Sequence, residues 1–172
     1  MMRLSLALAA VLSVGGMADA RAESLAQQAF ADLASLAGEW EGTYANGRSH
    51  HVSFALTAGD SVIVETWTMS PTRQSLTLYA LDGDRLLATH YCPQGNQPRL
   101  VLTERDTDDS YRFAFLDGTN LQDPNGSHQH ALEIAIDSAQ SFSRSETYVS
   151  NNPMGDVPAE VGERVHYRRV SP

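Results

Sequence analysis

The sequence predicts an all-β protein: an antiparallel up-and-down barrel of about ten strands preceded by one N-terminal helix. Apolar residues change from helical spacing to strict alternation after Gly38, and the alternation continues to the end of the chain. Short turn-forming stretches such as Asn46-Gly47 and Asp82-Gly83 separate the alternating segments, as they do in hairpins. A meander of so many strands is too wide to stay open, and closure into a barrel removes its exposed edges.

The N-terminal residues have the pattern of a secretory signal. Arg3 precedes an apolar stretch at 4–14, and small residues at 18–22 form a cleavage site. We predict cleavage of residues 1–22, a single domain over 23–172, and a periplasmic or secreted location. The apolar stretch is shorter than the roughly 20 residues that cross a bilayer, so no membrane span is expected after cleavage.

The mature chain is predicted to begin with one amphipathic helix over 24–37. Its apolar residues recur at steps of three and four, and Gly38 is a typical stop. The strands expected after it are 40–44, 49–57, 61–69, 75–81, 85–91, 99–105, 110–115, 130–137, 141–150 and 163–170.

Alternation predicts which side chains face the barrel interior. The expected inward stripes are Val52, Phe54 and Leu56; Leu76, Leu78 and Ala80; Tyr111, Phe113 and Phe115; and Leu132, Ile134 and Ile136. A barrel of this width encloses a cavity that holds a ligand unless its own side chains fill it. The longer connections, at 92–98, 117–129 and 151–162, are the expected functional loops.

Composition excludes several classes of function. The 172 residues include 12 basic and 21 acidic side chains, for a net charge of −9, and the sequence contains no lysine. Walker-type phosphate loops and Schiff-base enzymes are therefore excluded, and nucleic acid is not an expected partner. Cys92 is the only cysteine, so no internal disulfide can form.

The string Gly38-Glu39-Trp40-Glu41-Gly42 and the late pair Arg168 and Arg169 resemble the signature of the calycin superfamily, which includes the lipocalins. The resemblance implies that Trp40, beside Gly38, closes one end of the barrel. It also implies that a C-terminal arginine, expected to be Arg168, covers the indole ring. It implies a fold and a style of ligand binding, without a named ligand.

A second resemblance lies in the segment Thr-His-Tyr-Cys-Pro-Gln-Gly-Asn-Gln-Pro-Arg at 89–99 and in His128-Gln129-His130. Both are similar to segments of uncharacterised exported bacterial lipocalin-like proteins, a group with no activity to transfer. The heme-binding nitrobindins share the Gly-x-Trp-x-Gly opening and hold heme on a histidine of a C-terminal strand, which here would be His166. The glycine-rich continuation of their opening is missing after Gly42, so a heme cofactor is not favoured.

The predicted ligand site is the wall that contains His90 and Cys92. These residues are two apart on one strand and so point to the same face. Asn96, Gln97 and Arg99 follow in a proline-bounded loop and supply polar groups suited to a carboxylate, carbonyl or amide. The alternative is that the amides satisfy loop backbone and that Cys92 fills core space.

Metal binding is a second possibility for the histidines. His128 and His130 share i, i+2 geometry, and His90 or Cys92 could join them from a neighbouring wall. A hydrogen-bonded pair of loop histidines is the alternative. His90 with Cys92 could also form a base and nucleophile, but the sequence identifies no third group to orient them.

Two further pairs lie at same-face spacing: Glu65 with Trp67, and Arg144 with Glu146. They are interpreted either as a buried ion pair in a ligand-binding wall or as solvated cross-strand charges.

These observations favour an exported lipocalin-like protein that binds a small hydrophobic or amphipathic molecule by a polar anchor. The first alternative is a metal- or thiol-dependent enzyme that uses His90, Cys92, His128 and His130. The second is a structural or partner-binding envelope protein.

Overall fold

The computed structural model describes residues 22–107, 109–121, 126–149 and 160–170. The predicted signal, apart from its last residue, Ala22, lies outside the described residues. No helix in the described part of the chain is long and apolar enough to cross a membrane.

The predicted helix is present as α1, which spans Leu25–Ala34. Ser24 and Gln27 form a capping box at its start, because each side chain bonds to the backbone N–H of the other. The helix ends earlier than predicted, and Leu36 and Ala37 continue in tighter turns that bond to Leu33 and Ala34.

Ten antiparallel strands close into a barrel, as the sequence predicts. Strands β1 to β9 follow one another around the barrel, β8 pairs with β9, and β11 joins β9 to β1. A short further strand, β10, extends the pairing along β9. The strands are β1 Gly38–Thr43, β2 Ser49–Thr57, β3 Val62–Ser70, β4 Arg73–Asp82, β5 Arg85–Tyr91, β6 Gln97–Arg105, β7 Ser110–Thr119, β8 His128–Ser138, β9 Ser141–Val149, β10 Glu160–Val161 and β11 Val165–Arg169.

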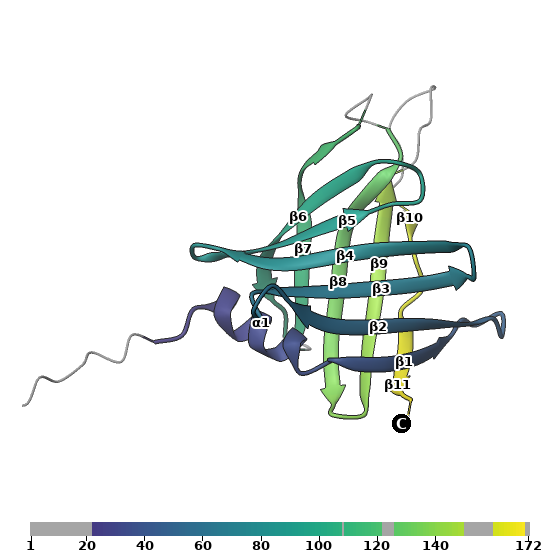
Figure 1. Cartoon of the computed structure of the whole chain (residues 1–172), viewed down its shortest axis with the longest axis horizontal. Helices are drawn as coiled ribbons and strands as arrows, with labels where there is room; N and C mark the ends of the chain where they lie inside the picture. The colour runs from purple at the N-terminus through teal and green to yellow at the C-terminus, as the bar shows by residue number, and fades with distance from the viewer. Residues whose placement is uncertain (1–21, 108, 122–125, 150–159, 171–172) are drawn as a thin grey trace, which may run out of the picture.

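The first strands cross over the last ones, so the barrel has two packed walls (Figure 1). Strands β1 to β5 form one wall, and β8, β9 and β11 run behind it. Helix α1 contacts β2, β4, β5 and β6 and covers the end of the barrel where β1 begins. The hairpins after β1 and β3 and the loop after β5 turn back at the opposite end, which we call the open end.

Trp40 closes the helix-covered end. Its side chain is fully buried, and its indole N–H donates to the carbonyl of Leu36 at 2.7 Å. The guanidinium of Arg169 lies 4.2 Å above the ring centroid. The same guanidinium donates to the carbonyls of Ser35 and Ala37, so one side chain joins the helix end to Trp40, which we call the barrel plug.

The arginine over Trp40 is Arg169, and the prediction of Arg168 was therefore wrong. Trp40 lies directly opposite Arg169 in the β1–β11 ladder, so both side chains point inward. Arg168, one residue earlier, faces solvent. Gly38 is required beside this pair, because its φ is +130° and an added Cβ would lie 2.7 Å from the Arg169 guanidinium.

The predicted inward stripes are correct on three strands, apart from Leu56 of β2, which is 37% exposed, and wrong on β4. Val52, Phe54, Tyr111, Phe113, Leu132 and Ile134 are buried. On β4 the buried residues are Ser75, Thr77 and Tyr79, whereas Leu76 is 37% exposed. The leucine stripe faces outward because Ser75 and Thr77 pair with Trp67 and Glu65, which belong to a polar part of the interior.

Candidate functional site

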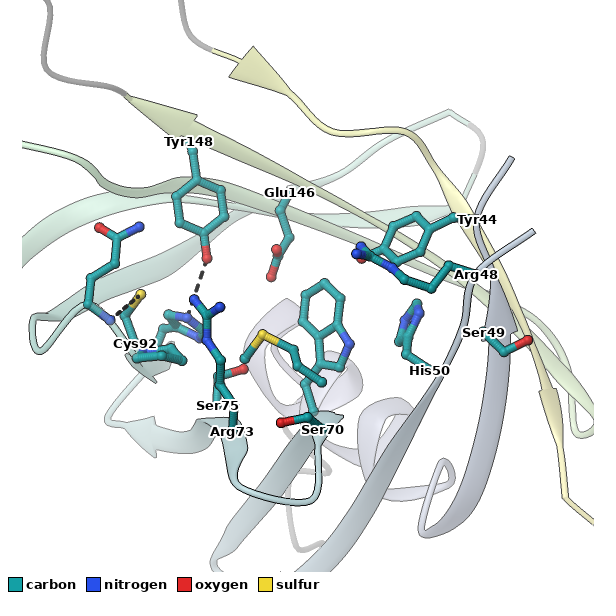
Figure 2. Close-up of a pocket in the computed structure, with 15 residues that line it drawn as sticks. Tyr44, Arg48, Ser49, His50, Ser70, Arg73, Ser75, Cys92, Glu146 and Tyr148 are labelled. Atoms are coloured by element: carbon teal, nitrogen blue, oxygen red, sulfur yellow. Dashed lines mark hydrogen bonds between the residues drawn. The ribbon is translucent and has the colours of Figure 1, made fainter. Parts of the chain in front are cut away.

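A cavity of about 460 Å³ opens at the open end of the barrel (Figure 2). Its walls come from the β1–β2 and β3–β4 hairpins, the end of β5 and the end of β9. The lining residues are Tyr44, Arg48, Ser49, His50, Trp67, Met69, Ser70, Arg73, Ser75, His90, Cys92, Pro93, Gln94, Glu146 and Tyr148.

His90 and Cys92 both line this cavity. His90 is 1% exposed, and its Nδ1 lies 3.0 Å from the hydroxyl of Thr77. Its Nε2 lies 3.4 Å from the hydroxyl of Tyr148, a longer contact drawn in Figure 2. Burial, with a contribution from the positive charge of Arg144, lowers the pKa of His90 to about 3. His90 is therefore a neutral imidazole at neutral pH.

The loop residues predicted to join His90 do not line the cavity. Asn96 donates to the carbonyl of Ser127 at 2.8 Å, and Gln97 donates to the carbonyl of Gly95 at 3.0 Å. These amides satisfy loop backbone, which is the alternative considered for them above.

Arg99 lies on the outer face of the barrel, where it pairs with Asp117 of the neighbouring strand. The prediction that Arg99 points toward the His90 wall was wrong. Pro98 and Leu100, the residues on either side of it, take the buried positions of β6, so alternation directs Arg99 outward.

A buried charge cluster adjoins the cavity. The sequence predicted the pairs Glu65 with Trp67 and Arg144 with Glu146, but not that the two pairs meet. Arg144 of β9 reaches Glu65 of β3 at 3.1 Å and Glu146 at 2.6 Å. Tyr79 donates to Glu65 at 2.6 Å, and Gln129 donates to Glu146 at 2.9 Å. The interpretation of these residues as solvated surface charges is therefore excluded.

An aromatic ring packs against the cluster. The Arg144 guanidinium lies 4.8 Å from the centroid of the Trp67 ring, a cation–π contact. The ion pair crosses the interior between β3 and β9, which are not hydrogen-bonded to each other. Burial raises the pKa of Glu146, because a carboxylate away from water is costly, although Arg144 acts in the opposite direction.

Two buried polar atoms in the cavity wall have no hydrogen-bond partner among the described residues: Nδ1 of His50 and Nε1 of Trp67. The other ring nitrogen of His50 is 2.6 Å from the hydroxyl of Tyr167. Burial, with a smaller contribution from Arg144, lowers the pKa of His50 to about 4, so this ring is also neutral at neutral pH. The sequence analysis did not identify His50 as a site residue.

His128 and His130 lie beside each other, 3.3 Å apart between Nε2 and Nδ1. His128 also contacts the carbonyl of Gly126 at 2.6 Å, and Phe115 packs against both rings. Within the described part of the chain, no group of three or more His, Cys, Asp or Glu side chains could hold a metal. His90 and Cys92 therefore do not complete the predicted ligand set.

The cavity does not arrange His90 and Cys92 as a base and nucleophile. The Cys92 sulfur accepts a 3.5 Å bond from the backbone N–H of Gln94, and burial raises the pKa of the thiol. A protonated thiol beside a histidine whose nitrogens contact Thr77 and Tyr148 is a poor nucleophile. His166, the residue implied as a heme ligand, is exposed on β11 and faces away from the interior.

No family model matches the chain, and no curated protein matches it. Among solved structures, the barrel is similar to the crystal structure of Rv2717c from M. tuberculosis, with a TM-score of 0.51 and 19% sequence identity. The similarity covers 86% of this chain and 99% of that chain. At this identity the similarity shows the fold alone, which is consistent with a calycin-like barrel.

Proposed function

We propose that the protein binds a small organic molecule, with a mainly apolar body and a polar group, in the cavity at the open end. The observation that carries the proposal is the pair of unpartnered buried atoms in the cavity wall, His50 Nδ1 and Trp67 Nε1. An unsatisfied buried polar group costs about 1 to 3 kcal/mol, and a ligand that bonds to it recovers that cost.

The rest of the wall suits the apolar body of such a ligand. Rings of Tyr44, Trp67 and Tyr148 line the cavity together with Met69 and Pro93. Its volume of about 460 Å³ lies in the range of small-molecule sites. An exported location, expected from residues 1–22, is part of the proposal, because a barrel of this kind would meet its ligand outside the cytoplasm.

Ser75 offers a way to fill the cavity without touching the polar groups. It is buried, lines the cavity and lies opposite Trp67 in the β3–β4 ladder. Leu76, the next residue, faces outward and provides a matched control. Ser75→Phe places a ring in the cavity, and Leu76→Phe places the same ring outside the barrel.

Native mass spectrometry of the protein purified from its own source tests the proposal. We expect wild type and Leu76→Phe to carry a bound organic mass that Ser75→Phe has lost. Ser75→Leu adds less volume to the cavity and should lose only part of the bound mass. It serves as a second variant in case Ser75→Phe does not fold. Retention of the mass by folded Ser75→Phe would place the ligand elsewhere. Absence of any mass from wild type would favour the partner-binding alternative.

A further inference from the structure

The charge cluster beside the cavity has one carboxylate more than it has cations. Arg144 is shared by Glu65 and Glu146, so the ionised cluster carries an excess negative charge. Glu65 and Arg144 are 1% and 2% exposed, whereas Glu146 is 11% exposed and is the member that lines the cavity. Figure 2 shows the Glu146 carboxylate pointing into the cavity.

One oxygen of Glu146 is available to a ligand. Its Oε1 accepts from both Arg144 and Gln129. Its Oε2 accepts no hydrogen bond from any described residue, and the atom is open to the cavity. A carboxylate oxygen can only accept, so the group that completes it must be a hydrogen-bond donor.

Among the described residues, no other side chain at this depth supplies the missing positive charge. His50 and His90 are neutral at neutral pH, and Tyr148 and Trp67 carry no charge. Arg48 and Arg73 also line the cavity, but both side chains are exposed at its mouth. Charges in water are screened, whereas a buried carboxylate acts at short range with little screening.

The rings around Glu146 favour a cation as well. Tyr148 is two residues away on the same face of β9, and Trp67 presents its ring to the same cavity. Aromatic faces attract ammonium and guanidinium groups, as Arg144 over Trp67 already illustrates. A cationic ligand would therefore meet both an acceptor and aromatic walls.

We propose that the ligand is a cationic amphiphile whose protonated amine or amidine donates to Glu146 Oε2, with its apolar body between Trp67 and Tyr148. This inference rests on the proposed function and specifies the class of ligand. Charges then alternate along the line Glu65, Arg144, Glu146 and ligand, and the buried cluster becomes neutral.

Matched probe series test the charge of the ligand. The first series is 2-phenylethylamine, 2-phenylethanol and phenylacetate, and the second is tryptamine, tryptophol and indole-3-acetate. Calorimetric titration at pH 7.5 should show each amine binding at least ten-fold more tightly than its alcohol, with the carboxylate weakest. Glu146→Gln should remove that preference, while Glu146→Asp, which keeps the charge, should retain it.

Glu41→Gln is the matched control, because Glu41 is exposed on the outer face of β1 and its change removes the same charge outside the cavity. It should leave the preference for amines intact. The amine proposal is overturned when an alcohol or carboxylate binds as tightly as its amine, when Glu146→Gln keeps the preference, or when neither amine binds at millimolar concentration. The binding function itself survives those results if the co-purified mass is lost from Ser75→Phe, and fails if that mass is absent or retained.

Discussion

Replacement of Arg144 by methionine is the most informative change to the stability of the barrel. Met keeps most of the side-chain volume but leaves Glu65 and Glu146 as two buried carboxylates without a cation. Removing one partner of a buried ion pair costs about 3 to 5 kcal/mol. For a domain of this size, each kcal/mol lowers the melting temperature by about 2 to 4 °C. The expected fall is therefore about 6 to 20 °C.

The loss of folding stability in Arg144→Met should depend on pH. Burial raises the pKa of Glu146 and Arg144 lowers it, so without the guanidinium the pKa of Glu146 in the folded state lies further above the unfolded value of about 4.3. The loss of stability then appears as the pH rises through about 4.3, because the carboxyl ionises more easily in the unfolded chain than in the buried cluster. As the pH falls to 4 and below, the carboxyls become increasingly protonated in both the folded and the unfolded state, and the difference from wild type should shrink.

Urea unfolding of wild type and Arg144→Met at pH 7 and pH 4 measures this difference. Arg112→Met is the control, because Arg112 contacts three carboxylates but is 41% exposed, and its loss should cost far less than the loss of Arg144. Adding Glu65→Gln and Glu146→Gln to Arg144→Met should restore much of the stability. A deficit below about 1 kcal/mol at pH 7, or one equally large at pH 4, would refute the account of the cluster.

Three further outcomes follow from the structure. Trp40→Ala should lower the free energy of unfolding by about 3 to 5 kcal/mol, and a loss below about 1 kcal/mol in urea would mean that Trp40 is not the barrel plug. His50 and His90, with pKa values of about 4 and 3, should make wild type less stable as the pH falls below about 6.5, because the unfolded histidines take up protons first. His90→Gln should reduce that slope, and an unchanged slope across pH 6.5 to 4 would contradict the burial of a neutral His90. Arg99→Ala should change stability by about 1 kcal/mol or less, since its partner Asp117 is also exposed, and should leave the co-purified mass unchanged. Loss of that mass would show that Arg99 contributes to ligand binding after all.

The parts of the fold that were predictable depend on local patterns. Alternation and turn residues located the strands, and β2 and β5 have the predicted bounds. The Gly-x-Trp string located the plug. The choice between Arg168 and Arg169, by contrast, depends on the pairing of β11 with β1, and a shift of one residue reverses the face.

The cavity was harder to predict, because its chemistry depends on contacts across the barrel. Glu65 and Arg144 are far apart in sequence and on strands that do not pair, so no local spacing reveals their contact. The leucines of β4 were assigned to the interior by hydrophobicity, but the interior there is polar, and Ser75 and Thr77 occupy it. His90 and Cys92 were found because they are only two residues apart, at the end of β5 and directly after it.

The fluorescence of Trp67 tests the central claim most directly, since the chain has two tryptophans and only Trp67 lines the cavity. Emission is followed during titration with 2-phenylethylamine, which does not emit at these wavelengths, in wild type, Ser75→Phe and Leu76→Phe. A ligand in the open-end cavity predicts a saturable change in wild type and Leu76→Phe, with the affinity found by calorimetry, and no change in Ser75→Phe. Calorimetric binding without any change in emission, or an equal change in Ser75→Phe, would contradict the claim that the cavity beside Trp67 is the binding site.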